Sequence, residues 1–185
     1  YTILLRHAVL ALADRHRQAL LRRGLTAEAV RSNGYATLPG PGRADAVATA
    51  RTGLDVTGVP GVVYSRRGRG SGQWTLAGPV GLVVPVRDYE GRVRGLQVRR
   101  DATDEGGKYR WVSSSGREGG TGSGTPLHWT LAGDREGPLW LTEGPLKSDV
   151  AAALSGHRFL AFAGTHPGQG RRLVDELEQA GHPLS

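Results

Sequence analysis

The sequence predicts an α+β protein with a small helical region at its N-terminus, a mixed or antiparallel β lobe in the middle, and the start of a parallel α/β unit at its end. Three observations lead to this prediction. Apolar residues recur at helical spacing in the first third, alternate with polar residues in the middle, and follow a strand–helix–strand–helix order in the last third. We expect a helical lobe over 1–52, a basic β-rich lobe with Gly/Ser loops over 53–135, and a partial α/β unit over 136–185.

Helix signals occur at three places in the first third. Residues 3–23 carry an apolar stripe that predicts one helix, with basic side chains crowded into its second half. Thr26 is placed to cap a second, short helix that stops at Asn33-Gly34. A turn-rich stretch over 35–41 follows, and a third short helix is expected from Asp45 to Arg51.

The middle of the chain changes to strand periodicity. Two runs joined by an Asp/Gly turn predict a hairpin, and the Gly/Ser-rich stretch over 113–125 predicts a mobile loop. The predicted strands are Val62–Tyr64, Trp74–Leu76, Gly81–Val86, Arg92–Arg99 and Lys108–Val112.

The last third alternates strands and helices. Residues 138–142 predict a buried strand, in which Trp140 is interpreted as a core residue, and a tight turn follows. Pro145 opens a helix that runs to Leu154, residues 158–163 form a second strand, and residues 169–180 form a second helix. This order is typical of a parallel sheet with right-handed crossovers.

Composition restricts the class of protein. The chain has 185 residues, 24 Lys or Arg against 17 Asp or Glu, and a net charge of +7. A polyanionic partner such as nucleic acid is favoured, although the dominance of Arg over Lys is also typical of a GC-rich genome. The absence of Cys excludes a disulfide scaffold, a Cys-ligated zinc ribbon and a thiol nucleophile. No apolar run approaches the roughly 20 residues of a membrane span, so we expect a cytoplasmic protein with no membrane partner.

Several catalytic motifs are absent from the sequence. It contains no P-loop, no H-E-x-x-H, and no G-x-S-x-G in a strand–turn–helix setting. The histidines have no metal-ligand spacing and are interpreted as surface or structural residues: His7, His16, His128, His157, His166 and His182.

Glu143 is the candidate functional residue with the clearest physical basis. It follows an apolar strand and precedes a helix, and ligands of parallel α/β sheets bind at the carboxyl ends of strands. A carboxylate at this place can hold a divalent metal or relay a proton. Alternatively, Glu143 only caps the helix behind it.

Two segments around this residue resemble the start of a Toprim domain, the metal-binding fold shared by bacterial primases, topoisomerases and some nucleases. They are Leu141-Thr142-Glu143-Gly144-Pro145-Leu146-Lys147-Ser148-Asp149 and Phe159-Leu160-Ala161-Phe162-Ala163-Gly164-Thr165. The start E-G-P-L-K-x-D is also similar to that of primase-like domains in plasmid and phage replication proteins.

The segments upstream are similar, in order, to the amino-terminal lobe of the DnaG-type primase polymerase core, and the resemblance covers residues 18–170. They are Val84-Pro85-Val86-Arg87-Asp88, Gly91-Arg92-Val93-Arg94-Gly95, and Lys108-Tyr109 with Ser113-Ser114. The resemblance implies a nucleotidyl-transfer site that uses Mg²⁺ or Mn²⁺, with Glu143 as its first catalytic, metal-associated acid. It also implies that Arg99 and Lys108 line the path of template and nucleotide.

This sequence departs from the DnaG-type pattern at two points. Lys147 stands where those proteins carry an Asp, and it is expected to contact a phosphate instead. The D-x-D pair of the family would follow a third strand, and the chain ends at Ser185 before it. Because the chain also has no Met, we expect an excised piece, truncated before D-x-D and inactive alone.

Three functions remain open from the sequence. The first is the template-binding part of a primase-like nucleotidyltransferase, the second a non-catalytic nucleic-acid-binding module of a replication or defence protein, and the third a Toprim nuclease. The implied partners are single-stranded DNA or an RNA/DNA template, nucleotides and a replicative helicase. Basic residues expected to bind nucleic acid are Arg66, Arg67, Arg69, Arg99, Lys108 and Lys147, and Trp74 or Trp111 is a candidate for stacking a base.

Overall fold

The computed structural model describes residues 1–66, 72–102, 107–118, 120–162 and 169–182. Its helical elements are α1 (Thr2–Arg6), the 3₁₀ turn η1 (Ala8–Leu10), α2 (Asp14–Leu21), α3 (Ala27–Asn33), α4 (Arg43–Arg51), α5 (Pro145–Ser155) and α6 (Gln169–Gln179). Its strands are β1 (Ala36–Leu38), β2 (Val62–Ser65), β3 (Gln73–Leu76), β4 (Gly81–Arg87), β5 (Val93–Arg100), β6 (Tyr109–Trp111), β7 (His128–Trp129), β8 (Asp134–Glu143) and β9 (His157–Phe162).

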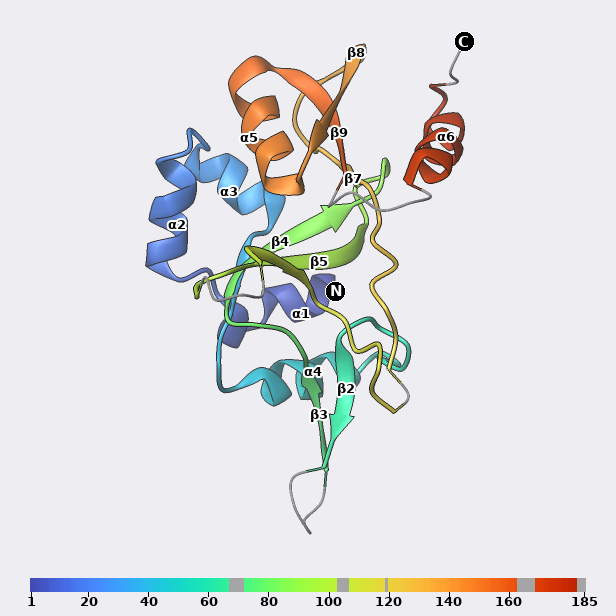
Figure 1. Ribbon diagram of the computed structural model, residues 1–185. Helices are drawn as coiled ribbons and strands as arrows, with labels where there is room; N and C mark the ends of the chain where they lie inside the picture. Colours follow the sequence, from blue (N-terminus) through green and yellow to red (C-terminus); the bar gives the residue numbers. More distant parts are fainter. Residues whose placement is uncertain (67–71, 103–106, 119, 163–168, 183–185) are drawn as a thin grey trace.

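The strands form three sheets within an α+β architecture, which confirms the predicted fold class (Figure 1). An antiparallel sheet has the order β1-β4-β5-β6, β2 and β3 form a separate hairpin, and a mixed sheet has the order β7-β9-β8. Within the described ranges, no helix has the length and apolar composition needed to cross a membrane.

The predicted single helix over 3–23 is wrong, because the segment is divided among α1, η1 and α2. His7 is extended, with φ −70° and ψ 138°, and its ring accepts a backbone hydrogen bond at the start of η1. Leu4 and Leu10 pack into one core, whereas Leu20 packs into another. The chain must turn between these two cores, and an uninterrupted helix cannot do so.

The next helix agrees with the sequence. The Thr26 hydroxyl accepts a hydrogen bond from the Ala29 N–H at 3.0 Å, and the helix ends at Gly34 with φ +67°. The turn-rich stretch expected over 35–41 is wrong at residues 36–38, where β1 pairs with β4. Helix α4 confirms the third predicted helix and begins two residues earlier, at Arg43.

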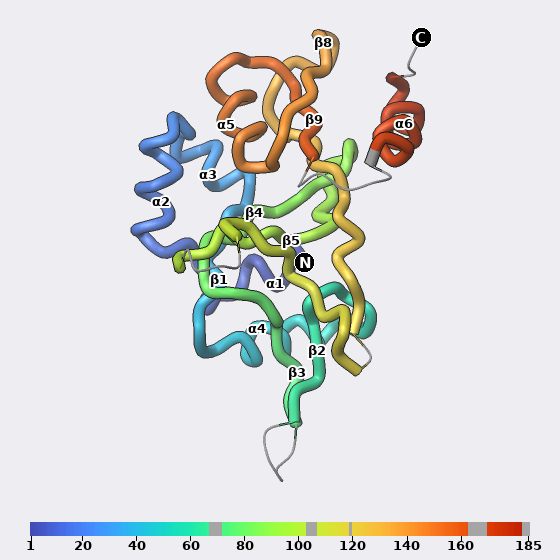
Figure 2. Tube along the Cα trace, in the orientation of Figure 1, coloured from blue at the N-terminus to red at the C-terminus, as the bar shows by residue number. Residues whose placement is uncertain are grey.

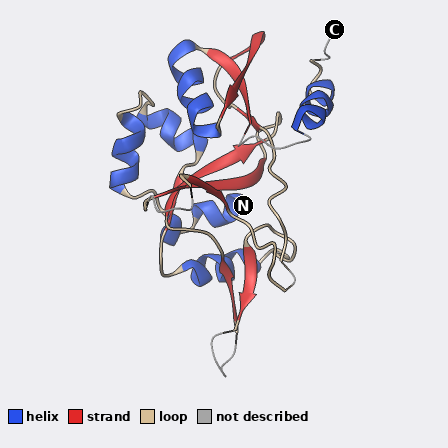
Figure 3. Cartoon of the chain, in the orientation of Figure 1, coloured by secondary structure: helices blue, strands red, loops and turns tan. Residues whose placement is uncertain are grey.

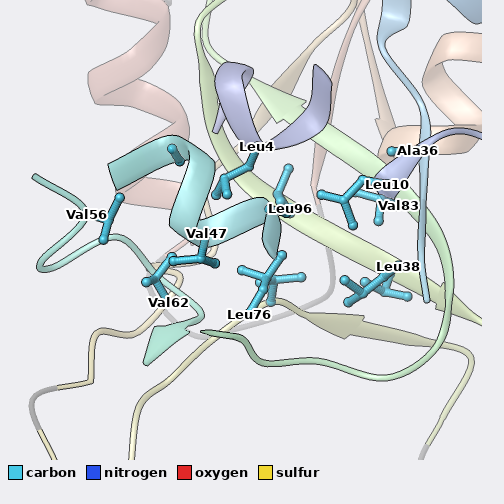
Figure 4. Packing of buried hydrophobic residues seen from close by; sticks show 14 residues of the cluster. Leu4, Leu10, Ala36, Leu38, Val47, Val56, Val62, Leu76, Val83 and Leu96 are labelled. Carbon is cyan, nitrogen blue, oxygen red and sulfur yellow. The ribbon is translucent and has the colours of Figure 1, made fainter. Parts of the chain in front are cut away.

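The strands β4 and β5 form the predicted hairpin and separate two cores. On one face, Val83 and Leu96 belong to the first core (Figure 4). Val98 is a further member of this core. Its buried members are Leu4, Leu10, Ala36, Leu38, Ala46, Val47, Ala50, Val56, Val62, Leu76, Val83, Leu96, Val98 and Val112. On the other face, Leu82 and Val84 join the second core with Leu20, Leu25, Val30, Tyr35 and Leu146.

The predicted β-α-β order at the end of the chain is confirmed, since β8 and β9 pair in parallel across α5. The expectation that 138–142 is a buried strand is wrong. Trp140 is 50% exposed and Leu141 is 51% exposed, because β8 lies at an edge of its sheet and, within the described residues, pairs with β9 alone. Trp140 is therefore not a core residue, and its ring stacks on His157 at a centroid distance of 5.6 Å.

The three sheets occupy successive regions of the molecule. The tube in Figure 2 shows the β4–β5 pair in the middle, with α5, β8 and β9 at one end and the β2–β3 hairpin at the other. Both ends combine helix and strand (Figure 3). Strand β1, which lies in the predicted helical lobe, joins the middle sheet. The domain boundaries expected at residues 52 and 135 stay predictions.

Candidate functional site

Glu143 is the last residue of β8 and projects from the point where the chain turns into α5. Gly144 makes the turn with φ +86°, a conformation that costs little only for glycine. Pro145 follows at the start of the helix, where its missing N–H leaves no bond unmade. The Glu143 side chain is 70% exposed, and its Oε2 lies 3.5 Å from Lys147 Nζ. An exposed pair of this kind adds little stability, so both groups remain available to a ligand.

A cavity of about 590 Å³ opens beside this turn. Glu143 and Lys147 lie on one side of it, and the sheet formed by β5 and β6 provides the other. The volume is within the range of small-molecule sites. Its further lining residues are Gln97, Tyr109, Arg110, Trp111, Ser113, Ser123, Gly144, Pro145 and Leu146.

Strand register explains which side chains reach this cavity from the sheet. Gln97 lies opposite Trp111, and Arg99 lies opposite Tyr109, in the β5–β6 ladder. Directly opposed residues project to the same face, as do residues two apart on one strand. Gln97, Tyr109 and Trp111 all line the cavity. Arg99 therefore shares the sheet face that looks toward Glu143.

Helix α5 is fixed over this face by apolar packing and by a buried polar cluster. Leu146, in its first turn, packs in the second core with Leu82 and Val84. In its second turn, Asp149 is 4% exposed and accepts a 2.6 Å hydrogen bond from the Tyr35 hydroxyl. These contacts hold the start of α5, and with it Glu143, at a defined place over the sheet.

The Asp149 cluster also defines the state of His128. His128 Nδ1 accepts the Arg87 backbone N–H at 3.2 Å, so Nε2 carries the proton and donates to the second Asp149 oxygen at 2.9 Å. Burial, followed by the charge and hydrogen bond of Asp149, raises the pKa of Tyr35 well above its usual value. Burial lowers the pKa of Arg87, which the Asp149 charge partly opposes. Because both of its oxygens are engaged inside the protein, Asp149 supports the fold and cannot serve as a ligand in the cavity.

Arg99 lines a second hollow, of about 320 Å³, on the same sheet face. Its Nε is buried and has no hydrogen-bond partner. The other residues of this hollow are Arg15, His16, Ala19, Arg100 and Asp101. An unpaired guanidinium N–H beside further arginines favours an anionic ligand such as phosphate.

Asp101 and His16 stabilise the wall of this second hollow. His16 lies between the Thr37 hydroxyl and the Asp101 carboxylate, at 2.8 Å from each. Arg15 donates to the other Asp101 oxygen at 2.8 Å. Burial opposes ionisation of Asp101, but the hydrogen bonds from His16 and Arg15 lower its pKa overall. This acid is thereby neutralised by its neighbours, and the hollow keeps its positive character.

Two of the remaining predicted basic residues, Lys108 and Arg66, line neither cavity. Lys108 is exposed just before β6, and its carbonyl accepts the Arg100 backbone N–H at 2.9 Å. Arg66 is exposed directly after β2, in the hairpin that lies at the other end of the molecule from β8 and β9 (Figure 1). Arg67 and Arg69 lie outside the described residues.

The donor set around Glu143 bears on the implied Mg²⁺ or Mn²⁺. No cluster of three His, Cys, Asp or Glu suited to a metal exists in the described part of the chain. Among the described residues that line its cavity, Glu143 is the one carboxylate. These residues do not fit a site that holds a free ion. They fit a site in which the Glu143 carboxylate makes one contact to an ion that is already bound to the phosphates of a ligand. Mg²⁺ is often bound in this way, by one or two carboxylates plus substrate phosphates.

Sequence reasoning did not identify the floor of the main cavity. Gln97, Tyr109 and Arg110 line it, but none was predicted as a site residue. The alternation of the β5–β6 pair carried the necessary signal, because it places Gln97 and Arg99 on one face. What the sequence did not indicate is that α5 packs over that face.

The fold is similar to that of DnaG primase catalytic cores. The RNA polymerase domain of Mycobacterium tuberculosis primase DnaG, in complex with a double-stranded DNA oligomer with a 6-nucleotide overhang, matches with a TM-score of 0.65 and 21% identity. That match covers 92% of this chain and 54% of the other. The Aquifex aeolicus primase, with its zinc-binding and RNA polymerase domains, matches with a TM-score of 0.58 and 19% identity over 89% of this chain and 41% of the other.

A DnaG primase catalytic domain bound to single-stranded DNA matches with a TM-score of 0.54 and 23% identity, over 89% of this chain and 52% of the other. The chain thus spans about half the length of these structures or less. No protein-family model and no curated protein matches the sequence. The similarity concerns the fold.

Proposed function

We propose that this chain is the nucleic-acid-binding part of a primase-like nucleotidyltransferase and that Glu143 belongs to its nucleotidyl-transfer site. One observation carries the proposal: the cavity beside Glu143 and the arginine-lined hollow at Arg99 lie on one face of the β5–β6 sheet. A template that follows the hollow would pass a nucleotide held in the cavity. The similarity to primase cores in complex with DNA supports this arrangement.

In this proposal, positive side chains bind the phosphates and Glu143 contacts the ion that accompanies them. Arg99 and Lys108 neutralise phosphates of the template, and Lys147 contacts a phosphate of the nucleotide as a point charge. Arg66, Arg67 and Arg69 are further candidates for phosphate contacts. A Mg²⁺ or Mn²⁺ ion bound to the nucleotide would stabilise developing negative charge during transfer. Glu143 would hold that ion, together with the phosphates, at the end of β8.

A second candidate function is a nucleic-acid-binding module without catalysis. The lone carboxylate in the cavity favours it, because two-metal phosphoryl transfer needs several. The third alternative, a Toprim nuclease, would use the same Glu143 to assist hydrolysis. Incubation of a labelled single-stranded oligonucleotide with the chain, nucleotides and Mn²⁺ separates the nuclease, which would cleave the oligonucleotide, from the other two functions, which would leave it uncut. Templated extension would contradict the expectation that the chain is inactive alone and would exclude the module without catalysis.

Salt-dependent binding of a fluorescein-labelled single-stranded DNA tests the proposal directly. We expect micromolar or weaker affinity that falls as salt rises, because binding releases counterions from phosphates. Replacing both Arg99 and Lys108 by alanine should weaken binding and lower the slope of log affinity against log salt by about 0.7 for each phosphate that is no longer neutralised.

An arginine outside the proposed surface provides the control. Arg135 is exposed near the start of β8 and lines neither hollow, so Arg135→Ala should leave the salt slope unchanged. Glu143→Ala should also bind DNA normally without metal. A wild-type chain that does not bind DNA at low salt would contradict the proposal, and an unchanged slope in the double variant would remove Arg99 and Lys108 from the site.

A further inference from the structure

The floor of the Glu143 cavity contains an aromatic ring and an amide that phosphate binding alone does not require. Trp111 and Gln97 are directly opposed in the β5–β6 ladder and both line the cavity. Lys147 and Glu143 lie at its other side. One cavity therefore combines a charged side suited to phosphates with a flat aromatic surface beside a hydrogen-bonding group.

Gln97 is largely buried, but its amide keeps contact with solvent, since Arg99 Nε is the one fully buried polar side-chain atom without a partner in the described residues. The residue is only 6% exposed, and its amide forms no hydrogen bond within the described part of the chain. The amide can donate two hydrogen bonds and accept two. Because Gln97 lines the cavity, a ligand that enters it can supply the missing partners.

The indole of Trp111 lies close to the neighbouring strand β5 because Gly95 on that strand has no side chain. A Cβ at Gly95 would lie 3.0 Å from Trp111 Cζ3 and 3.2 Å from Pro126 Cγ. The glycine thus lets the ring lie close over β5, where a larger residue would displace it. Trp111 remains half-buried at the cavity, so its ring offers a prepositioned surface for stacking.

We propose that this cavity is a base-reading nucleotide subsite, in which Trp111 stacks on the nucleobase and Gln97 hydrogen-bonds to its edge. The inference rests on the proposed function and adds a substrate class to it, a nucleoside triphosphate selected by its base. Stacking on an aromatic ring accepts any base, so it supplies affinity. The Gln97 amide supplies the selection among bases. Its N–H donor and carbonyl acceptor match adenine, which glutamine recognises through an N–H group and a neighbouring ring nitrogen.

Isothermal titration of the chain with ATP, GTP, CTP and UTP in Mg²⁺ tests the base selection. We expect ATP to bind about tenfold more tightly than the weakest of the other three, the discrimination typical of one bidentate amide–base contact. Gln97→Leu should remove this ranking while retaining binding. Equal affinities of all four nucleotides for the wild-type chain would overturn the assigned role of Gln97, and this result requires no variant to fold.

Two tryptophan variants test the stacking. Trp111→Leu should weaken binding of all four nucleotides at least about fivefold, given the energy of base–aromatic stacking. Trp140→Leu is the matched control, because Trp140 is half exposed on β8 and does not line the cavity. Thermal unfolding midpoints show whether each variant is folded. Unchanged nucleotide affinity in a folded Trp111→Leu variant would overturn the subsite.

The DNA titration separates this inference from the function on which it rests. Wild-type chain that binds single-stranded DNA with the expected salt slope but shows no base ranking contradicts the subsite and leaves the proposed function standing. Wild-type chain that binds neither DNA nor nucleotide contradicts both.

Discussion

The Tyr35 hydroxyl donates a 2.6 Å hydrogen bond to the Asp149 carboxylate, which joins the segment between α3 and β1 to the second turn of α5. Tyr35 is 6% exposed and Asp149 is 4% exposed. The carboxylate accepts a second bond from His128 Nε2, so its charge is satisfied by two donors from distant parts of the chain. This buried contact fixes the helix whose first turn carries Lys147 and follows Glu143.

Tyr35→Phe should destabilise the protein by removing one of the two donors to Asp149. A hydrogen bond to a charged group contributes about 1.5–3 kcal/mol, so the free energy of unfolding should fall by about that amount. Urea denaturation followed by circular dichroism measures it. Tyr64→Phe is the matched control, because Tyr64 is 45% exposed and its hydroxyl makes no hydrogen bond within the described residues. Equal losses of stability in the two variants would contradict the stabilising role of the Tyr35–Asp149 hydrogen bond.

The same hydroxyl should make stability sensitive to alkaline pH. Burial and Asp149 raise the pKa of Tyr35 above its usual value of 10.0 in the folded protein. Above pH 10, the unfolded chain therefore loses the Tyr35 proton while the folded chain keeps it, and unfolding becomes more favourable. The difference in unfolding free energy between wild type and Tyr35→Phe should shrink as pH rises above 10. A difference that stays constant from pH 8 to pH 11 would contradict a raised pKa for Tyr35.

The sequence was sufficient to predict elements whose signals are local. The cap at Thr26 and the Asp/Gly turn between β4 and β5 depend on neighbouring residues, and both were predicted correctly. Glu143 was placed correctly at the end of a strand by the same kind of signal. Local signals gave wrong predictions where tertiary packing decides the secondary structure. Residues 3–23 divide between two cores instead of forming one helix, and β1 adds to the sheet where a turn was expected.

The candidate site shows the same limit. Strand alternation places Gln97 and Arg99 on one face, but only the structure shows that α5 covers that face and encloses a cavity. The apolar run around Trp140 predicted burial, yet β8 is an edge strand and the ring is half exposed. Hydrophobicity alone does not tell a central strand from an edge, because that depends on which other strands pair with it.

Gly81→Ala should strongly destabilise the β4–β5 hairpin. Gly81 has φ +157°, and a Cβ there would clash with the Arg99 carbonyl oxygen, which is backbone and cannot move aside. We expect a loss of at least about 2 kcal/mol in the free energy of unfolding, together with weaker DNA binding because Arg99 is displaced. Gly40→Ala provides the control, since nothing lies within 4 Å of that position. A Gly81→Ala protein as stable as Gly40→Ala would contradict the close approach of the two strands at this position.

Glu143→Gln should change nucleotide affinity in opposite directions with and without a divalent ion. In EDTA the Glu143 carboxylate repels the phosphates of ATP, so its neutralisation should tighten binding. In Mg²⁺ the same carboxylate attracts the ion carried by the phosphates, and its neutralisation should weaken binding. Each change should be about fivefold, since one exposed charge at contact distance contributes about 1 kcal/mol. Glu136→Gln, on the exposed part of β8 outside the cavity, should shift neither value. Isothermal titration in both buffers gives the sign directly, and a Glu143→Gln effect of the same sign in EDTA and in Mg²⁺ would show that this carboxylate does not contact the ion.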